Sequence, residues 1–307
     1  MQRETILQIG AFSEQLQQTI DAEFDTVSED VVNADESLRV GIRAIITRSA
    51  CQIPAALLDR LPALRVIATS GVGYDGLPVA AAKSRGIVVT NTPGVLDAAV
   101  CELSIGLLLS LLRKIPAMDS YVRLGGWKNG PWPMTTGLQG KRVGIVGLGR
   151  IGRGIAERLQ PFGVKLAYCG RQRQPVPYEY VETIHELAGS VDILILSCPG
   201  GPSTESLVDA EVLSRLGSKG FLVNVSRGSV VDESALIHAL QKNVIRGAAL
   251  DVFRHEPLVE SPLTALDNVV LSPHSGSATE ETRSIMLRLT LDNIHKVLTG
   301  EQALSPV

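Results

Sequence analysis

The chain has 307 residues, of which 45% are hydrophobic and 20% are charged, and its net charge is −3. At about 150 residues per domain, this length suggests two domains, each long enough to bury its own core. The near-balance of charge excludes a concentrated basic surface for nucleic acid or an anionic membrane, and the lack of about 20 consecutive apolar residues excludes a transmembrane helix.

Short β-branched segments alternate with longer helical segments along the whole chain. The first series of predicted strands covers residues 6–10, 42–47, 65–70 and 87–90. The second series covers residues 142–147, 164–169, 191–198, 221–226, 247–253 and 268–273. Segments between them, such as Arg150–Gln160 and Glu233–Lys242, are long enough for crossover helices. This alternation predicts an α/β protein with two doubly wound parallel sheets.

The helix predicted at Asp97–Arg113 marks the boundary between the two units, because it is apolar nearly all round and should be deeply buried. Near the C-terminus, Glu280–Thr299 has apolar residues at helical spacing and would carry the chain back to the first unit. We therefore expect one discontinuous domain at residues 1–98 and 281–307, with a second domain, residues 99–280, inserted into it.

A glycine-rich turn, GLGRIG, directly follows the first strand of the second series and precedes an amphipathic helix. In this context Gly147 permits the tight turn, Gly149 lets a pyrophosphate approach the backbone, and Gly152 allows close packing of helix on strand. The N–H groups of Arg150 and Ile151 open the helix and supply its positive dipole end. The motif predicts a dinucleotide site, with a purely structural turn as the alternative.

The residue that reads the adenosine ribose should lie about 20 positions further on, at the end of the next strand. NAD-selective sites place an acidic residue there, whereas this chain reads Cys169-Gly-Arg171-Gln172-Arg173 and has no carboxylate before Glu179. Two guanidinium groups suit the 2′-phosphate of NADP, because arginine forms bidentate, charge-assisted bonds with phosphate. The pattern predicts NADPH rather than NADH as cofactor, unless the arginines are solvated loop residues.

Four motifs occur in a fixed order: GLGRIG at 147–152, NVSRGSVVDE at 224–233, LDVFRHEP at 250–257 and SPHSGSAT at 272–279. With them the chain resembles the D-isomer-specific 2-hydroxyacid dehydrogenases, and in particular their glyoxylate/hydroxypyruvate reductase branch. Matches at 70–76, 86–96 and 198–208 extend the resemblance over essentially the whole chain. It implies a Rossmann-type cofactor domain inserted into a flavodoxin-like substrate domain, and NADPH-dependent reduction of a small 2-keto acid to the D-2-hydroxy acid.

The resemblance implies that His274 is the general acid, Glu256 its partner, and Arg227 the guanidinium that binds substrate. The chemistry agrees, because reduction of a keto acid needs a hydride donor, a proton donor and a cation for the carboxylate. A free imidazole is mostly neutral at pH 7, so a neighbouring carboxylate is needed to favour its protonated form. Arg227 follows a predicted strand and should emerge at the edge where ligands bind. Ordinary loop roles are the alternatives.

The resemblance also assigns further contacts, residue by residue. On the substrate side, Val72 and Gly73 would hold the carboxylate through backbone N–H groups. Trp132 would close the site of a partner subunit, with simple surface or core packing as the alternative. The cofactor is expected to contact Arg227, His274 and the residues of the two loops described above. Further contacts are expected at the nicotinamide from Val225, Asp251, Gly276 and Ser277. Near the adenosine they are expected from Pro199 and Thr204. One departure concerns Asp97 and Ala98, which stand where many members have Thr and Asp.

Residues 125–140, rich in Gly, Pro and Trp, are typical of a functional loop or an interface arm. The resemblance implies a homodimer built on this region. The cysteines are scattered, the histidines lack metal-ligand spacing, and the N-terminus lacks a secretory signal, which together predict a cytoplasmic protein without a metal site. The remaining alternatives are a reductase of bulkier acids, such as 2-ketogluconate or an aryl pyruvate, and a cofactor-sensing interaction protein.

Overall fold

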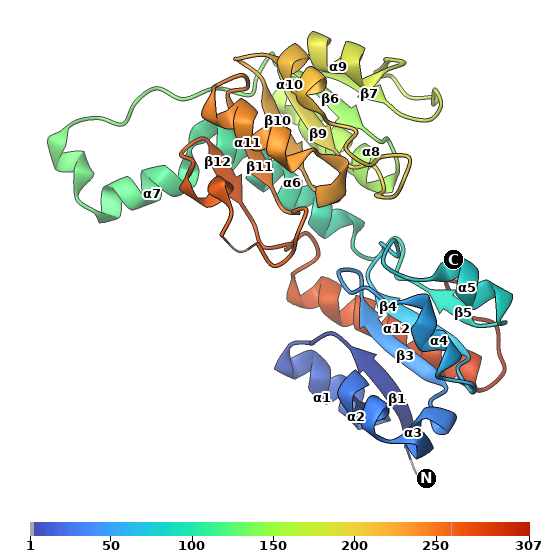
Figure 1. Ribbon diagram of the computed structural model, residues 1–307. Helices are drawn as coiled ribbons and strands as arrows, with labels where there is room; N and C mark the ends of the chain where they lie inside the picture. The colour runs from blue at the N-terminus through green and yellow to red at the C-terminus, as the bar shows by residue number, and fades with distance from the viewer. Residues whose placement is uncertain (1–2, 259) are drawn as a thin grey trace. The chain divides into compact units, whose positions relative to one another are not determined.

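A computed structural model describes residues 3–258 and 260–307 (Figure 1). The chain forms two compact units, Met1–Leu96 with Ser277–Val307 and Asp97–Gly276. The expected boundaries at 98 and 280 lie close to these divisions. Ser277, which was expected beside Gly276 at the nicotinamide, therefore begins the C-terminal part of the first unit.

The first unit holds a five-stranded parallel sheet in the order β2-β1-β3-β4-β5. This is the flavodoxin-like order predicted for this part of the chain. Its strands are β1 (Glu4–Ile9), β2 (Phe24–Val27), β3 (Ala44–Arg48), β4 (Val66–Ser70) and β5 (Val88–Thr90). Its helices are α1 (Glu14–Glu23), α2 (Glu29–Ala34), α3 (Glu36–Gly41), α4 (Ala55–Asp59), α5 (Val79–Ser84) and α12 (Glu280–Leu298).

Both faces of this sheet are covered by helices. Ile67 of β4 belongs to a buried cluster with Leu57 of α4, whereas its neighbour Ala68 packs with Leu291 of α12 on the opposite face. Alternate residues of a strand point to opposite faces, so a strand buried on both sides reads as a continuous apolar run. This explains why these strands were predictable. The edge strand β2 was not predicted.

The second unit holds a seven-stranded parallel sheet in the order β12-β11-β10-β9-β6-β7-β8. Its strands are β6 (Arg142–Val146), β7 (Lys165–Cys169), β8 (Glu179–Tyr180), β9 (Ile193–Leu196), β10 (Phe221–Asn224), β11 (Gly247–Leu250) and β12 (Val269–Leu271). Its α-helices are α6 (Asp97–Arg113), α7 (Ile115–Arg123), α8 (Arg150–Leu159), α9 (Ile184–Ser190), α10 (Ala210–Leu216) and α11 (Glu233–Gln241). Short 3₁₀ turns are η1 (Gly126–Asn129), η2 (Gln160–Phe162), η3 (Gly228–Val230) and η4 (Pro262–Ala265). The two sheets confirm the predicted fold class.

The strand order of the second sheet reverses at β6, which lies between β7 and β9. Val146, the last residue of β6, is level with Cys169 of β7 and Leu196 of β9. The carboxyl ends of the three strands therefore meet at one edge, where open α/β sheets bind ligands.

Helix α6 packs on α8, the helix that follows the glycine-rich turn. It spans the range predicted from its composition, Asp97–Arg113, and buries eight of its seventeen residues, while Ala98, Glu102, Gly106 and Arg113 form an exposed face. The contact with α8 is close, because a Cβ atom at Gly154 would lie 2.7 Å from Sγ of Cys101. The Cys101 thiol also donates to the carbonyl of Ile151 over 3.3 Å. These contacts fix the orientation of α8.

An arm leaves this unit after α6 and carries α7, which stands away from the sheet of its own unit in Figure 1. Several of its apolar side chains are exposed, including Leu124 at 87%, Trp127 at 70% and Met134 at 99%. Trp132 is half-buried against Tyr121 of α7, with ring centroids 5.1 Å apart. Large apolar side chains gathered on one exposed segment are typical of an interaction surface.

Candidate active site

The glycine-rich turn after β6 has the geometry that a dinucleotide requires. Gly147 has a φ of +90°, and a Cβ atom there would lie 2.7 Å from the backbone of Cys198. At Gly152 a Cβ atom would meet the carbonyl oxygen of Gly147 at 2.1 Å. Nothing lies within 4 Å of a Cβ position at Gly149, so the backbone there is open to a ligand. These features fit a pyrophosphate at the N-terminus of α8.

The side chain of Arg150 is held at the start of α6. Its Nε lies 3.0 Å from Oδ2 of Asp97, one of the positions where the sequence departs from the family pattern. The other carboxylate oxygen, Oδ1, is buried and has no hydrogen-bond partner in the described part of the chain. With its guanidinium engaged by Asp97, Arg150 offers an anion its backbone N–H in the first turn of α8.

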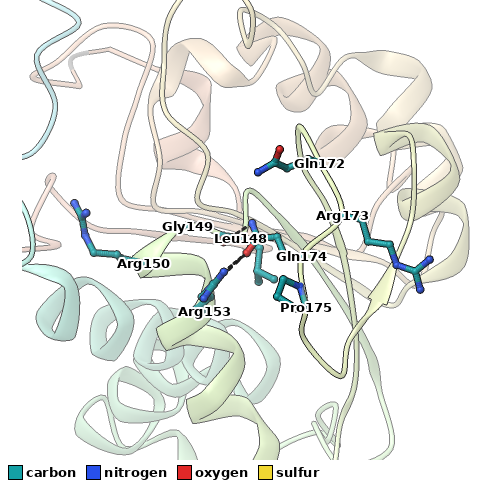
Figure 2. A pocket seen from close by; sticks show the side chains of 8 residues that line it. All are labelled: Leu148, Gly149, Arg150, Arg153, Gln172, Arg173, Gln174 and Pro175. Atoms are coloured by element: carbon teal, nitrogen blue, oxygen red, sulfur yellow. Dashed lines mark hydrogen bonds between the residues drawn. The ribbon is translucent and has the colours of Figure 1, made fainter.

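A pocket of about 480 Å³ opens beside this turn, at the start of α8 and the loop that follows β7 (Figure 2). It is lined by Leu148, Gly149, Arg150, Arg153, Gln172, Arg173, Gln174 and Pro175. The predicted residues Gln172 and Arg173 line it, whereas Arg171 does not, and all three are exposed. Sequence reasoning missed Arg153 and Gln174. A usable signal was the spacing of Arg153, three residues after Arg150 on the same helix.

Asp251, directly after β11, organises the loop that carries His274. Its Oδ1 accepts hydrogen bonds from Oγ of Ser272 at 2.6 Å and from the N–H of Ser275 at 2.7 Å. Its Oδ2 accepts from the N–H of Gly276 at 2.9 Å. The residue is only 2% exposed, so these donors compensate the burial of a charge. The sequence assigned Asp251 to the nicotinamide carboxamide, and its bonds to the loop were not foreseen.

His274 is fixed through its backbone and its ring. Its φ of +51° is unusual for a residue other than glycine, and its N–H donates to the carbonyl of Asp251 over 2.8 Å. Nδ1 lies 2.6 Å from Oε2 of Glu256. The side chain is 33% exposed, and Nε2 makes no hydrogen bond within the described residues. This leaves Nε2 available to a ligand.

Glu256 is placed to hold the imidazole. Its Oε1 accepts from the N–H of Phe253 over 3.0 Å, while Oε2 contacts His274. Partial burial raises the pKa of Glu256, but the hydrogen bond and charge of His274, the Phe253 N–H and the charge of Arg227 outweigh this and hold it below its ordinary value. The carboxylate is therefore ionised at neutral pH, and it faces Nδ1 of His274.

Arg227 follows β10, as the motif predicted, and its Nη1 donates to the carbonyl of Ser226 over 2.8 Å. Buried Asn224 fastens this turn: its Nδ2 donates to the carbonyl of Arg227 over 3.0 Å, and its Oδ1 accepts from the N–H and Oγ of Ser226. The charge of Arg227 contributes to the lowered pKa of Glu256. Asn224 is a further positioning residue that sequence reasoning missed.

The remaining predicted contacts of the second unit lie after strands β10 and β9 and on the arm. Val225 is buried directly after β10, and its N–H donates to the carbonyl of Leu196. Past β9, Oγ1 of Thr204 donates to the carbonyl of Pro199 over 2.7 Å. The Nε1 atom of Trp132 on the arm is buried and has no hydrogen-bond partner among the residues described.

In the first unit, Val72 and Gly73 follow β4, and the carbonyl of Val72 accepts from Nδ2 of Asn91 over 2.8 Å. Ser277 precedes α12, and its carbonyl accepts from Nε of Arg283 over 3.1 Å. No group of three His, Cys, Asp or Glu side chains suited to a metal occurs in the described residues. Among these residues, no helix has the length and apolar character needed to cross a membrane.

Comparisons with known proteins agree with this geometry. The profile of the D-isomer specific 2-hydroxyacid dehydrogenase NAD binding domain matches residues 105–276. A hydroxyphenylpyruvate reductase of Plectranthus scutellarioides is 44% identical, over 87% of this chain and 85% of the relative. A glyoxylate/hydroxypyruvate reductase of Arabidopsis thaliana is also 44% identical, over 89% and 87%. The crystal structure of an NADPH-dependent glyoxylate/hydroxypyruvate reductase from Sinorhizobium meliloti, in complex with NADP and malonate, is 42% identical with a TM-score of 0.92, and the match covers 100% of this chain and 97% of that one.

Proposed function

Because the chain belongs to the D-isomer-specific 2-hydroxyacid dehydrogenase family and is an NAD(P)-dependent enzyme, we propose that it reduces glyoxylate or hydroxypyruvate with NADPH. The product would be the D-2-hydroxy acid. The observation that carries the proposal is the 2.6 Å contact between His274 and Glu256, at the edge of a sheet whose glycine-rich turn fits a dinucleotide.

His274 acts in this proposal as the proton donor. NADPH, when bound, would supply the hydride for the keto carbon, and Nε2 of His274 would donate the proton to the carbonyl oxygen. The Glu256 carboxylate at Nδ1 orients the ring and favours the imidazolium, while the Nε2 side has no competing hydrogen bond from the described residues. The left-handed backbone of His274 and its bond to the Asp251 carbonyl set the direction of the ring.

Arg227 binds the substrate carboxylate and polarises the neighbouring keto oxygen. Its planar guanidinium suits a carboxylate better than a lysine would, because it donates two parallel hydrogen bonds. Asn224 fixes the turn that carries it. For the first unit, we propose that the N–H groups of Val72 and Gly73 also bind the carboxylate.

The cofactor contacts are proposed as follows. The open backbone at Gly149 and the first-turn N–H groups of Arg150 and Ile151 would bind the pyrophosphate. Arg171, Gln172 and Arg173 follow β7 without a carboxylate among them, which favours the 2′-phosphate of NADPH. The Sinorhizobium meliloti enzyme, whose structure holds NADP, supports this choice. We propose that the nicotinamide is contacted by Val225, Asp251, Gly276 and Ser277. The adenosine would be contacted by Pro199 and Thr204.

The arm supports a homodimer as the functional assembly. It exposes the apolar side chains of Leu124, Trp127 and Met134. Contact with a second copy of the chain would remove this apolar surface from water. Dimers are also the commonest oligomers. Trp132 would then contribute to the partner's site. Light scattering at micromolar concentration should give a mass near twice 32.8 kDa, and a monomer would remove both this assembly and the role of Trp132.

A second candidate substrate class is a bulkier 2-keto acid, since the Plectranthus scutellarioides relative is a hydroxyphenylpyruvate reductase. The alternative of an interaction protein is not favoured, because the matched relatives are enzymes. Initial rates of NADPH oxidation with glyoxylate, hydroxypyruvate, phenylpyruvate and 2-ketogluconate distinguish the candidates, and chiral analysis of the product identifies its hand. We expect the highest kcat/KM with one of the two small acids. A higher value with phenylpyruvate would contradict the proposed substrate class.

A further inference from the structure

Gln174 provides the main attachment of the loop after β7. Its N–H donates to the hydroxyl of Tyr168 over 2.6 Å, and Tyr168 is only 1% exposed. Its Nε2 donates to the carbonyl of Leu148, in the glycine-rich turn, over 3.0 Å. Gln174 therefore ties the loop both to the buried strand and to the turn that begins α8.

Gln174 also holds a guanidinium that the sequence did not single out. Its Oε1 accepts from Nε of Arg153 at 3.1 Å and from Nη2 of the same residue. No other hydrogen bond from the Arg153 side chain occurs among the described residues, so its remaining N–H groups stay available. Figure 2 shows Arg153 directed toward Gln174 at the wall of the pocket.

The other arginines near the pocket are arranged differently. The side chains of Arg150 and Arg173 point away from Gln174 in Figure 2, and Arg150 is paired with Asp97. Arg171 does not line the pocket. Of these guanidiniums, that of Arg153 is the one oriented at the pocket by a residue of the loop that follows β7.

We propose that Arg153, oriented by Gln174, binds the 2′-phosphate of NADPH and contributes to the selection of NADPH over NADH. The inference rests on the proposed use of NADPH and adds a specificity residue from α8 to those of the loop. Each part has a physical basis: the pocket adjoins the turn that would hold the pyrophosphate, a phosphate monoester attracts a guanidinium strongly, and a bond already made to Gln174 reduces the flexibility that binding must remove.

Binding of 2′,5′-ADP and 5′-AMP, measured by isothermal titration calorimetry, tests the proposal without turnover. The two ligands differ only in the 2′-phosphate. We expect Arg153→Ala to lower the affinity for 2′,5′-ADP about tenfold or more, the scale of one charge-assisted bond. The affinity for 5′-AMP should stay nearly unchanged. The affinity of Arg153→Lys for 2′,5′-ADP should lie between those of the unmodified protein and Arg153→Ala, because lysine keeps the charge but loses the planar pair of donors.

Arg158→Ala is the matched control, because it removes a guanidinium from the same helix at a residue that lies near Glu102 and outside the pocket. Gln174→Ala should lose part of the affinity for 2′,5′-ADP. In the double variant with Arg153→Ala, the affinity should be little lower than in Arg153→Ala alone, since the two residues act as a unit. A purely structural role of Gln174 would weaken both ligands.

Two results would overturn the inference, and they have different consequences. If the unmodified protein prefers 2′,5′-ADP, but Arg153→Ala loses no more of that preference than Arg158→Ala, then Arg153 does not bind the 2′-phosphate and the proposed use of NADPH stands. If the unmodified protein binds 2′,5′-ADP no better than 5′-AMP, both the inference and the proposed cofactor preference fail.

Discussion

Two loops of the second unit follow strands of the same parallel sheet. The polar groups of one loop are bonded to one another, whereas the charged side chains of the other are exposed. In the loop at residues 272–276, buried Asp251 accepts from Ser272, Ser275 and Gly276, and the ring of His274 is held by Glu256. In the loop at residues 170–175, Arg171 and Arg173 are exposed, and Gln174 provides the main attachment.

This difference matches what each loop is proposed to do. Proton transfer depends on a donor held within a few tenths of an ångström of its target, so the groups around His274 are bonded to one another before substrate arrives. Recognition of a phosphate depends on charge, which acts over a longer distance and tolerates mobile side chains at the cost of salt sensitivity. The first loop is therefore expected to control kcat, and the second to control cofactor affinity.

The largest expected effect is on His274. His274→Ala should lower kcat by about 10²-fold or more, the usual scale for loss of a general acid, with little change in the dissociation constant of NADPH. Steady-state kinetics and a direct binding titration measure the two quantities. The exposed neighbour His255 is the matched control, and His255→Ala should leave kcat unchanged. A near-normal kcat in His274→Ala would remove this residue from the mechanism.

The next effect concerns the buried carboxylate that holds the loop carrying His274. Asp251→Asn places an amide donor among groups that already donate to Asp251, so we expect kcat to fall about tenfold and the free energy of unfolding to fall by about 1–3 kcal/mol. Urea unfolding and kinetics check both. Asp267→Asn, at an exposed position in the same region of the chain, is the control. Equal stabilities of the two variants would show that the Asp251 network does not organise the loop.

The next effect is expected in the exposed loop and concerns KM rather than kcat. Arg171→Ala combined with Arg173→Ala should raise the KM for NADPH about tenfold or more and leave turnover with NADH nearly unchanged, since even one charge-assisted bond to phosphate is worth roughly 1.5–3 kcal/mol. Added salt should weaken the NADPH preference of the unmodified protein, because exposed charges are screened over about 8–10 Å. An unaltered KM would show that both arginines remain in solvent.

The smallest effect is a shift of a pH profile. The pKa of Glu256 lies below its ordinary value, so its carboxylate is charged at neutral pH beside Nδ1 of His274. In Glu256→Gln this charge is lost, the ring gives up its proton at lower pH, and the fall of kcat on the alkaline side should begin at lower pH. Some activity should remain. A profile that coincides with that of the unmodified protein would show that the two side chains do not interact in the working enzyme.

The elements that the sequence predicted are those with strong periodicity or complete burial. Helix α6 is apolar nearly all round, and the central strands of both sheets are continuous apolar runs between turns. The edge strands β2 and β8 were missed, because each is short and only partly buried, so that no alternation or apolar run marks it. Burial against both faces, rather than strand propensity, made a segment recognisable.

The same division holds for the site. Arg227, Glu256 and His274 stand in motifs at strand ends, where sequence context alone indicates a chemical role. Arg153 and Asn224 were missed because their roles depend on tertiary contacts: Arg153 meets Gln174 from another element, and Asn224 folds back on its own turn. The pairing of Arg150 with Asp97, across 53 positions, was equally invisible in a local pattern.

The most direct measurement is the kcat/KM of the unmodified protein for NADPH and for NADH, each with hydroxypyruvate as substrate. We expect turnover with NADPH and a preference for it of at least about tenfold, the equivalent of one charge-assisted bond to the 2′-phosphate. No turnover with either cofactor would contradict the proposed reaction, and equal values or a preference for NADH would contradict the reading of the loop after β7.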